Sequence, residues 1–398
     1  MHTPSSRSNA ANSVPLLDVS RQNDGLRDEL LAALADVCDS GRFIHGPQCA
    51  ELESRVAEYC QTTHAVGCAS GSDALLLALM VLDIGPGDEV ILPSFTFFAT
   101  AGAVWRLGAK PVFADIVPDT FNVDPESVRR QITPATRAII PVHLFGQCAD
   151  MDALAEITAD AKIAIIEDAA QAIGAEWAGR GAGSMGRLGC FSFYPTKNLG
   201  GCGDGGMITT DDAQLAARLR ILRDHGQHPQ YHHQLVGINS RLDTLQAAAL
   251  LVKLARLDRW TTQRRENAQR YAGSFARLGL NTRLGLPAES NACHHVWNQY
   301  TIRVPEGARD ELRERLAGVG VGSAVYYPVP LHLQECFAPL GYKIGSLPET
   351  ERAAREVLSL PIFPGLSAQE IDAVVDAVGR ALPECGRDVG RRRDASAA

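Results

Sequence analysis

The stretch Asp88–Ile116, DEVILPSFTFFATAGAVWRLGAKPVFADI, contains the alternation that decides the fold. Its two ends, DEVILPS and KPVFADI, are short apolar runs closed by polar or turn residues, which is typical of buried strands. The segment between them, FFATAGAVWRLG, is mostly apolar and has the length of a helix. A strand, a helix and a second strand in this order form a βαβ unit, in which the two strands lie parallel in one sheet.

The same alternation continues before and after this stretch. Three more runs have the composition of buried strands: HAVGCAS, RAIIPVH and KIAIIEDAA. Helical segments stand between the runs: SDALLLALMVLDIG, ESVRRQI and DMDALAEITADA. We therefore expect an α/β fold whose large domain has a mostly parallel sheet covered by helices on both faces.

The pattern changes near residue 240. Residues 243–279 read as one helical stretch, far longer than the usual helix of about 11–12 residues. Beyond it come a strand, VWNQYTIRV, and two helices, ARDELRERLAGVG and AQEIDAVVDAVGRAL. We predict a large domain over residues 15–250 and a smaller C-terminal α+β domain over residues 251–385, with disordered ends at 1–14 and 386–398.

Composition excludes several classes of protein. The net charge of the 398 residues is −8, so no excess of positive charge can neutralise a nucleic-acid backbone. The most apolar segment, Ala74–Ile84, is too short to span a bilayer, and residues 1–13 lack the apolar region of a secretion signal. The ten cysteines are scattered singly, as in reduced proteins. We expect a cytoplasmic protein with no membrane segment and no nucleic-acid partner.

A single lysine, Lys197, stands in the segment Phe191–Gly206, FSFYPTKNLGGCGDGG. A phosphate-binding P-loop would place glycines before the lysine and a hydroxyl after it, whereas here the glycines follow and Asn198 comes next. A solvated turn is the simple alternative. The run FSFYP, however, reads as a buried strand that would deliver Lys197 to a sheet edge, where α/β folds bind ligands. Burial there would lower the pKa of the amine and make it a nucleophile.

Asp168 ends the run IAIIED, and a carboxylate at the end of a buried strand is costly unless something pairs with it. A pyridoxal phosphate (PLP) enzyme needs a lysine that attaches the cofactor and an acidic side chain that keeps the pyridine nitrogen protonated. Lys197 and Asp168 suit these two tasks, although many α/β proteins offer a similar pair. Ser70–Gly71–Ser72, just before a helix, would suit the phosphate; a plain N-cap turn fits these residues equally well.

Seven motifs together resemble those of a known family, the DegT/StrS nucleotide-sugar aminotransferases, and occur in the family's order. This family belongs to the PLP enzymes of fold type I, which share an aspartate-aminotransferase-like fold. The resemblance covers the chain from about Pro15 to about Leu382. The motifs are ASGSDAL, PSFTFFAT, VHLFGQ, IEDAAQAIGA, FSFYPTKNLGGCGDGG, GINSRLDTLQAAAL and YYPVPLHLQ.

The resemblance implies roles for the matching residues. Lys197 would attach the cofactor and serve as the catalytic base, and Asp168 would bind the pyridine nitrogen. Gln171 would contact the phenolic oxygen of the cofactor. Phe97 would stack on the cofactor ring, with a place in the core as the alternative. The phosphate would be held by Gly71, Ser72 and Ser192.

Other positions concern a second subunit and the substrate. Asn239 would reach the phosphate from a partner chain, so the resemblance implies a homodimer with shared active sites. Arg241 would lie near the substrate from the same partner. His332 would either touch the sugar or have a structural role. Ser72 and Asp204 stand where many members have Thr and Glu, which keeps the chemical type.

Four histidines lie close together in DHGQHPQYHH, so a metal site is conceivable. No Asp, Glu or Cys lies among residues 228–233 to complete a ligand set, and the segment reads as an irregular loop. We therefore expect contacts with the substrate or a partner chain, and no metal. The histidines are His225, His228, His232 and His233.

The resemblance implies transfer of an amino group from an amino acid, usually L-glutamate, to a UDP- or dTDP-linked keto-sugar, with pyridoxamine phosphate as the intermediate form of the cofactor. Such amino sugars enter polysaccharides or glycosylated metabolites. A dehydratase branch of the family has His in place of the cofactor lysine, so Lys197 favours transamination. The segment YHH…VGINSRLDTLQAA is most similar to members that act on 3-keto sugars, which favours C3.

Three alternatives stay open at this point: amination at C4, another fold type I reaction such as aminodehydration, and a pleiotropic regulatory protein. The acidic composition and the absence of a helix-turn-helix pattern disfavour DNA binding. A regulator would also have no need of Lys197 and Asp168.

Overall fold

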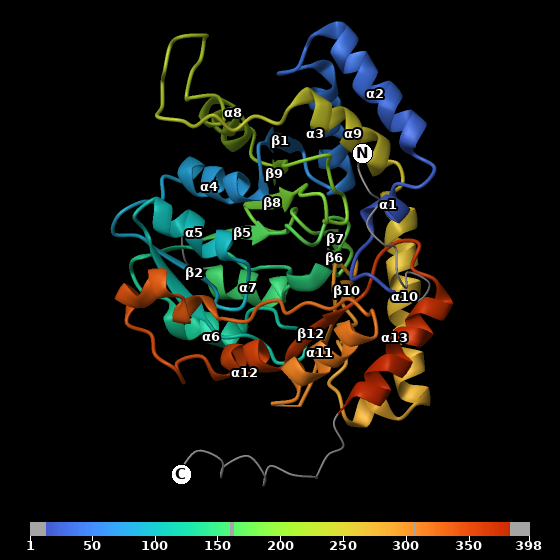
Figure 1. Ribbon diagram of the computed structural model, residues 1–398. Helices are drawn as coiled ribbons and strands as arrows, with labels where there is room; N and C mark the ends of the chain where they lie inside the picture. The colour runs from blue at the N-terminus through green and yellow to red at the C-terminus, as the bar shows by residue number, and fades with distance from the viewer. Residues whose placement is uncertain (1–12, 160–162, 306, 383–398) are drawn as a thin grey trace, which may run out of the picture.

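The computed structural model describes residues 13–159, 163–305 and 307–382. Its centre is a seven-stranded sheet with the strand order β1-β9-β8-β5-β4-β2-β3 (Figure 1). All strands run parallel except β9, which is antiparallel to both of its neighbours. The strands are β1 His64–Cys68, β2 Glu89–Pro93, β3 Lys110–Ala114, β4 Thr136–Ile139, β5 Ala164–Asp168, β8 Leu188–Ser192 and β9 Gly206–Thr210.

The βαβ unit expected from Asp88–Ile116 is confirmed: β2 and β3 pair in parallel, and α5 (Phe98–Arg106) connects them. Side chains alternate along β2, so Ile91 enters one hydrophobic core while Val90 and Leu92 enter another. Both faces of the strand are therefore buried, which explains why its sequence is a continuous apolar run.

Helices cover both faces of the sheet, as the sequence predicts. Each set of helices contributes its apolar side chains to a separate core. One face carries α4 (Gly71–Val81), α5 and α8 (Ala213–Leu222). The other carries α3 (Pro47–Tyr59), α6 (Pro125–Gln131), α7 (Met151–Thr158) and α9 (Thr244–Leu254).

The expectation of one continuous helix over residues 243–279 is wrong. The helix α9 ends at Leu254, and α10 (Leu257–Arg277) begins two residues after Ala255. The two helices have different packing partners: α9 lies against α2 (Arg27–Ser40) and α3, whereas α10 lies against α13 (Ala368–Ala381), as Figure 1 shows. The chain bends between them because each helix buries its apolar face in a different core.

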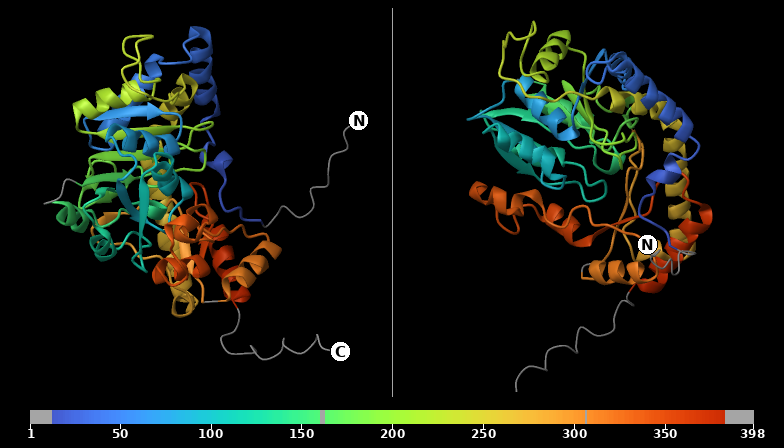
Figure 2. Two further views of the ribbon diagram at one scale, coloured as in Figure 1. Left: turned by 90° about the vertical axis from the view of Figure 1, so that its left-hand side faces the viewer. Right: turned by 45° about the horizontal axis from the view of Figure 1, so that its top comes forward.

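The C-terminal part contains a two-stranded antiparallel sheet, β11 (Tyr300–Arg303) and β12 (Val357–Leu360). These strands form a third core with α10, α11 (Arg309–Gly318) and α13. In the left view of Figure 2 the orange and red helices of this part gather below the large sheet. The remaining elements of this part are η3 Leu280–Thr282, η4 Leu331–Leu333, η5 Glu335–Leu340 and α12 Pro348–Glu356.

The segment with η4 and η5 returns to the large sheet, where Leu331 and Phe337 join the core of α4 and α5. At the other end of the chain, Val14 is buried and pairs with Val321. The domain boundaries at 250 and 251 stay a prediction, and most of the two expected disordered ends lies outside the described residues. Among the residues described, no helix is both long and apolar enough to cross a membrane.

Short elements complete the fold. A small sheet has the strand order β10-β6-β7. Its strands are β6 Glu176–Trp177, β7 Arg180–Gly181 and β10 Cys293–His294. Two short helices are α1 Val19–Gln22 and η2 Leu144–Gly146.

Candidate active site

A cavity of about 650 Å³ opens where β2, β5 and β8 end. This is the edge at which α/β sheets bind ligands, because the carboxyl ends of parallel strands meet there. Seven residues that the sequence singles out line this cavity, as the sequence predicts for a common site. They are Gly71, Ser72, Phe97, Asp168, Gln171, Ser192 and Lys197.

Lys197 lies in the loop that follows β8, and its backbone N–H donates to the carbonyl of Tyr194 at 2.8 Å. Burial lowers the pKa of the Lys197 amine to about 8, and the neighbouring Asp168 carboxylate opposes that shift. Within the described ranges, the Lys197 Nζ has no hydrogen-bond partner and no ion pair. The amine is therefore free to react, and a fraction of it is uncharged at neutral pH.

Asp168 is the last residue of β5 and is only 5% exposed. Its Oδ2 accepts a hydrogen bond from Thr100 Oγ1 at 2.8 Å, and its Oδ1 accepts one from the Ala170 N–H at 3.2 Å. Burial raises the pKa of Asp168, while these two hydrogen bonds and the charge of Lys197 oppose the rise. The carboxylate is thus held in one orientation at the cavity wall and retains acceptor capacity for a further donor.

The helix α4 begins at the cavity with Gly71, and Ser70 is its N-cap. Ser70 Oγ accepts the Asp73 N–H at 3.1 Å, which confirms the N-cap interpretation. The N–H groups of the first turn have no acceptor within the helix, so those of Gly71 and Ser72 are available to an anion. A Cβ at Gly71 would lie 2.6 Å from Ser192 Cβ, so only glycine lets the helix start approach Ser192 this closely.

The loop around Lys197 is fixed by its neighbours. A Cβ at Gly200 would overlap the backbone carbonyl of Pro195, so the glycine allows the loop to fold back on itself after the lysine. The carbonyl of Gly200 accepts a hydrogen bond from Lys253 Nζ at 2.8 Å. Asn198 is 2% exposed and donates to the carbonyl of Val296 at 2.9 Å. The glycines thus shape the loop and are not a phosphate cradle.

A glutamine, Gln171, and a phenylalanine, Phe97, complete the wall of the cavity. Gln171 Oε1 accepts the Phe145 N–H at 2.6 Å, and its Nε2 donates to the hydroxyl of Tyr327 at 3.4 Å. Phe97 is 58% exposed and lines the cavity, whereas Phe95 is 1% exposed in the core. The structure therefore decides against a core position for Phe97.

Asn239 and Arg241 line a different hollow, of about 480 Å³. This hollow adjoins the first cavity, because Ser70 and Asp204 line both. Asn239 is exposed, and Arg241 pairs with Asp224 at 2.9 Å. Within one chain, the structure does not bring Asn239 or Arg241 to the Lys197 cavity.

His332 does not line the cavity either. It is 2% exposed, its Nδ1 is hydrogen-bonded to Ser94 Oγ at 2.7 Å, and its Nε2 lies 3.3 Å from Glu351 Oε1. Burial lowers the pKa of His332, and Glu351 opposes that shift. Of the two roles considered for His332, the structure favours the structural one, because both ring nitrogens are already engaged.

Several lining residues carry no assignment from the sequence. Tyr326 and Tyr327 come from the C-terminal part, and Asn298 and Gln299 precede β11. Thr100, which holds Asp168, is the third residue of α5. The YYP motif in the sequence could have pointed to the two tyrosines. The contact between Thr100 and Asp168 could not be read from the sequence, because it depends on the order of strands in the sheet.

The donor set can be compared with the needs of PLP. The cofactor needs an amine for attachment, a carboxylate for its ring nitrogen and an anion site for its phosphate. Lys197, Asp168 and the start of α4 provide these groups around one cavity, and Phe97 offers an aromatic face. These residues fit PLP, and together with the α/β fold they define a PLP-dependent enzyme.

Comparison with known proteins gives the family. The model of the DegT/DnrJ/EryC1/StrS aminotransferase family matches residues 24–379, so the chain belongs to this family and is a PLP-dependent aminotransferase. It is 50% identical over 365 residues to a pleiotropic regulatory protein of Geobacillus stearothermophilus, covering 92% of this chain and 97% of the relative. It is 47% identical over 365 residues to dTDP-3-amino-3,4,6-trideoxy-alpha-D-glucose transaminase of Streptomyces venezuelae, covering 92% and 95%.

A solved structure shows the same fold. The crystal structure of S. venezuelae DesV in complex with a ketimine intermediate has a TM-score of 0.89 and 47% sequence identity to this chain. The match covers 93% of this chain and 98% of DesV. The α/β fold and the PLP dependence expected from the sequence are therefore confirmed.

Proposed function

We propose that the protein transfers an amino group from L-glutamate to C3 of a nucleotide-linked keto-sugar, with Lys197 and Asp168 as the catalytic pair. The observation that carries this proposal is the Lys197 amine, free of any partner among the described residues, beside the buried Asp168 carboxylate in one cavity. Amino-sugar biosynthesis is the corresponding process.

The residues around the cavity have distinct tasks in this proposal. Asp168 would hold the ring nitrogen, with Thr100 fixing its carboxylate. Gln171 would face the phenolic oxygen, and Phe97 would cover the ring. The phosphate would be held by Gly71, Ser72 and Ser192.

Bound PLP supplies an electron sink that stabilises negative charge on the carbon that loses a proton. Lys197 Nζ would accept that proton and deliver it to its new position. Its pKa of about 8 suits this task, because a base with a pKa near the working pH can both take up and release a proton. The cavity walls would keep water away from the charged groups, which strengthens their interactions.

Dimer formation would complete the site. Asn239 is exposed in a hollow that shares Ser70 with the first cavity, so a residue of a second chain can reach the phosphate region through it. The loop after α8 projects from the body in Figure 1 and carries Tyr231 and Val236, which are 80% and 92% exposed. Apolar side chains this exposed favour burial against a partner. We propose a homodimer in which Asn239 and Arg241 act in the neighbouring site.

A subunit-mixing experiment tests the shared site. Lys197→Ala and Asn239→Ala should each be inactive as homodimers but should complement each other when mixed, because each mixed dimer then has one intact site. Up to about a quarter of wild-type activity should return, provided that subunits mix at random. The matched control is Lys197→Ala mixed with Asp168→Asn, which should not recover activity, because Lys197 and Asp168 of one site come from the same chain and both sites of the mixed dimer are then defective. No recovery when Lys197→Ala is mixed with Asn239→Ala would contradict the shared site.

The position of amination rests on the relatives. The S. venezuelae relative is named a 3-amino-sugar transaminase, and its similarity extends over nearly the whole of both chains. The test is mass spectrometry of products from a panel of UDP- and dTDP-linked 3-keto and 4-keto sugars, each with glutamate. We expect amino sugars from the 3-keto compounds; turnover of only 4-keto sugars would overturn the C3 proposal and leave the aminotransferase in place.

The name of the G. stearothermophilus relative favours a second candidate, a regulatory role. The net charge of −8 argues against direct binding to DNA. A gel-shift titration separates the candidates: specific, salt-sensitive binding to DNA by a protein that aminates no keto-sugar would favour regulation.

A further inference from the structure

Two cysteines that are 145 positions apart in the chain meet at one hydrophobic core. The backbone N–H of Cys148 donates to the Sγ of Cys293 at 3.3 Å. The two side chains also meet in one hydrophobic core, and each thiol shifts the pKa of the other. Because N–Cα is about 1.5 Å, the Cys293 sulfur lies within about 5 Å of the Cys148 Cα, so the two cysteines are close neighbours, as a disulfide requires.

The surroundings make the two thiols unequal. The hydrogen bonds from the Cys148 thiol and its N–H lower the pKa of the Cys293 thiol, with help from the charge of Arg265 and against burial and Glu289. The pKa of Cys148 is raised, because its thiol is the donor to Cys293 and is buried. Cys293 is also partly exposed, whereas Cys148 is 2% exposed. A partly exposed thiol with a lowered pKa beside a second, buried thiol is the arrangement of an attacking and a resolving cysteine.

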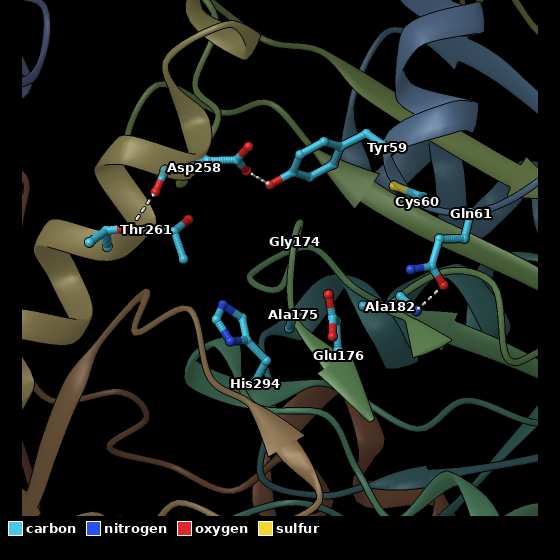
Figure 3. Close-up of a pocket in the computed structure, with 12 residues that line it drawn as sticks. Tyr59, Cys60, Gln61, Gly174, Ala175, Glu176, Ala182, Asp258, Thr261 and His294 are labelled. Carbon is cyan, nitrogen blue, oxygen red and sulfur yellow. Dashed lines mark hydrogen bonds between the residues drawn. The ribbon is translucent and has the colours of Figure 1, made fainter. Parts of the chain in front are cut away.

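The small strand β10 explains how Cys293 faces Cys148. Successive side chains of a strand point to opposite faces. His294 points into the hollow drawn in Figure 3, which Tyr59, Glu176 and Asp258 also line. Cys293 therefore faces the other way and packs against the core that contains Cys148.

We propose that Cys148 and Cys293 form a reversible disulfide when the protein meets a peroxide. The Cys293 thiolate attacks one oxygen of hydrogen peroxide, the O–O bond breaks, and hydroxide leaves and takes up a proton to become water. The resulting sulfenic acid is attacked by the Cys148 sulfur, which loses its proton, and a second water leaves as the S–S bond forms. The two thiols lose two electrons in total, and the peroxide is reduced to two waters.

The disulfide would tie together two segments that support the cavity. The carbonyl of Gly146, two residues before Cys148, accepts the Val296 N–H at 2.9 Å. The carbonyl of Val296 accepts a hydrogen bond from Asn198, which follows Lys197 in the chain. On the other side, the Phe145 N–H holds Gln171. The pair is thus a modification site in the support of the Lys197 loop, and its oxidation does not depend on which substrate the enzyme uses.

Peptide mapping by mass spectrometry tests the proposal. The PLP-loaded full chain is treated with hydrogen peroxide, free thiols are alkylated, and the digest is analysed without reduction. We expect a cross-linked peptide that joins Cys148 to Cys293, lacks two hydrogens relative to its reduced parts, and disappears after treatment with dithiothreitol. The Cys148→Ala variant should instead stop at a Cys293 sulfenic acid, which dimedone labels.

The control uses an exposed, isolated cysteine. The Cys336→Ser variant should form the Cys148–Cys293 peptide to the same extent as the wild type, because Cys336 is exposed and lies on η5. The proposal is overturned if Cys148 and Cys293 both remain alkylated as free thiols while exposed cysteines such as Cys202 and Cys336 are oxidised. This wild-type measurement decides the matter even if a variant fails to fold.

Discussion

Two neighbouring carboxylates at the end of β5 have opposite environments. Glu167 is fully buried, and its oxygens accept hydrogen bonds from His143 Nε2 at 2.8 Å and from three backbone N–H groups. Asp168 accepts hydrogen bonds from Thr100 and Ala170 and lines the cavity with Lys197. Because side chains alternate along a strand, the two carboxylates lie on opposite faces of the sheet.

The difference shows what separates a structural carboxylate from a functional one. The acceptor capacity of Glu167 is used by the protein itself, since the loop at Gly183, Met185 and Gly186 is hydrogen-bonded to it. Asp168 can still accept a hydrogen bond from a ligand, and the amine of Lys197 lies in the same cavity. Burial is common to both, so the pattern of partners decides the role.

The largest effect is expected from Asp168→Asn. The amide cannot stabilise a positive charge on the ring nitrogen, so kcat/KM should fall by at least about 100-fold. The free energy of unfolding should change little or rise, because a buried charge is removed. Steady-state kinetics and thermal unfolding measure the two effects, and activity within about fivefold of wild type would contradict the assigned role.

Glu167→Gln should give the reverse pattern. It weakens the hydrogen bonds to His143 and to the backbone of the loop, so the free energy of unfolding should fall by about 3 kcal/mol. In the fraction that stays folded, kcat should remain within a few-fold of wild type. Denaturant unfolding combined with activity per folded molecule checks this; a large loss of kcat without a loss of stability would place Glu167 in the chemistry.

Thr100→Val should have a smaller effect, which appears in the pH profile. The Thr100 hydrogen bond lowers the pKa of Asp168, so its removal raises that pKa further. Asp168 is needed as a carboxylate, and activity is lost as the pH falls through its pKa; the acid limb of kcat/KM should therefore move to higher pH. We expect a loss of about fivefold at neutral pH. Thr100→Ser keeps the hydroxyl and should restore the wild-type profile, and an unshifted limb in the valine variant would refute the contact's role.

The smallest effect concerns the capture of PLP by the unloaded protein. The rate should rise with pH through a midpoint near 8, because only the uncharged Lys197 amine reacts and its pKa is about 8. In Asp168→Asn the midpoint should move lower, since the Asp168 charge raises the pKa of Lys197. Stopped-flow absorbance at several pH values measures it. A midpoint near 10.4, the usual value for lysine, would mean that Lys197 is not desolvated.

The sequence predicts much of this arrangement, because the signals are local. The alternation in Asp88–Ile116 indicates parallel strands, and the ends of such strands bring Asp168 and Lys197 to one edge. The preference for Asp168 over Glu167 rests on the family motif, since both residues end the same apolar run.

Other features depend on contacts that sequence order does not reveal. Thr100 reaches Asp168 only because β4 alone separates β5 from β2 in the sheet. No glycine or proline marks the bend between α9 and α10 at Ala255 and Arg256, which arises from two packing surfaces. His332 is buried by Ser94, a residue 238 positions away.

The most direct test of the account is to find which lysine carries the cofactor. The chain has five lysines, and Lys253 is the best control because it is also buried, with a lowered pKa caused by burial. Lys253 donates to the carbonyl of Gly200 and does not line the cavity. Borohydride reduction of the PLP-loaded protein, followed by peptide mass spectrometry, should place the cofactor on Lys197 alone. Cofactor on Lys253, or a Lys197→Ala variant that is still labelled to the wild-type extent, would contradict the account.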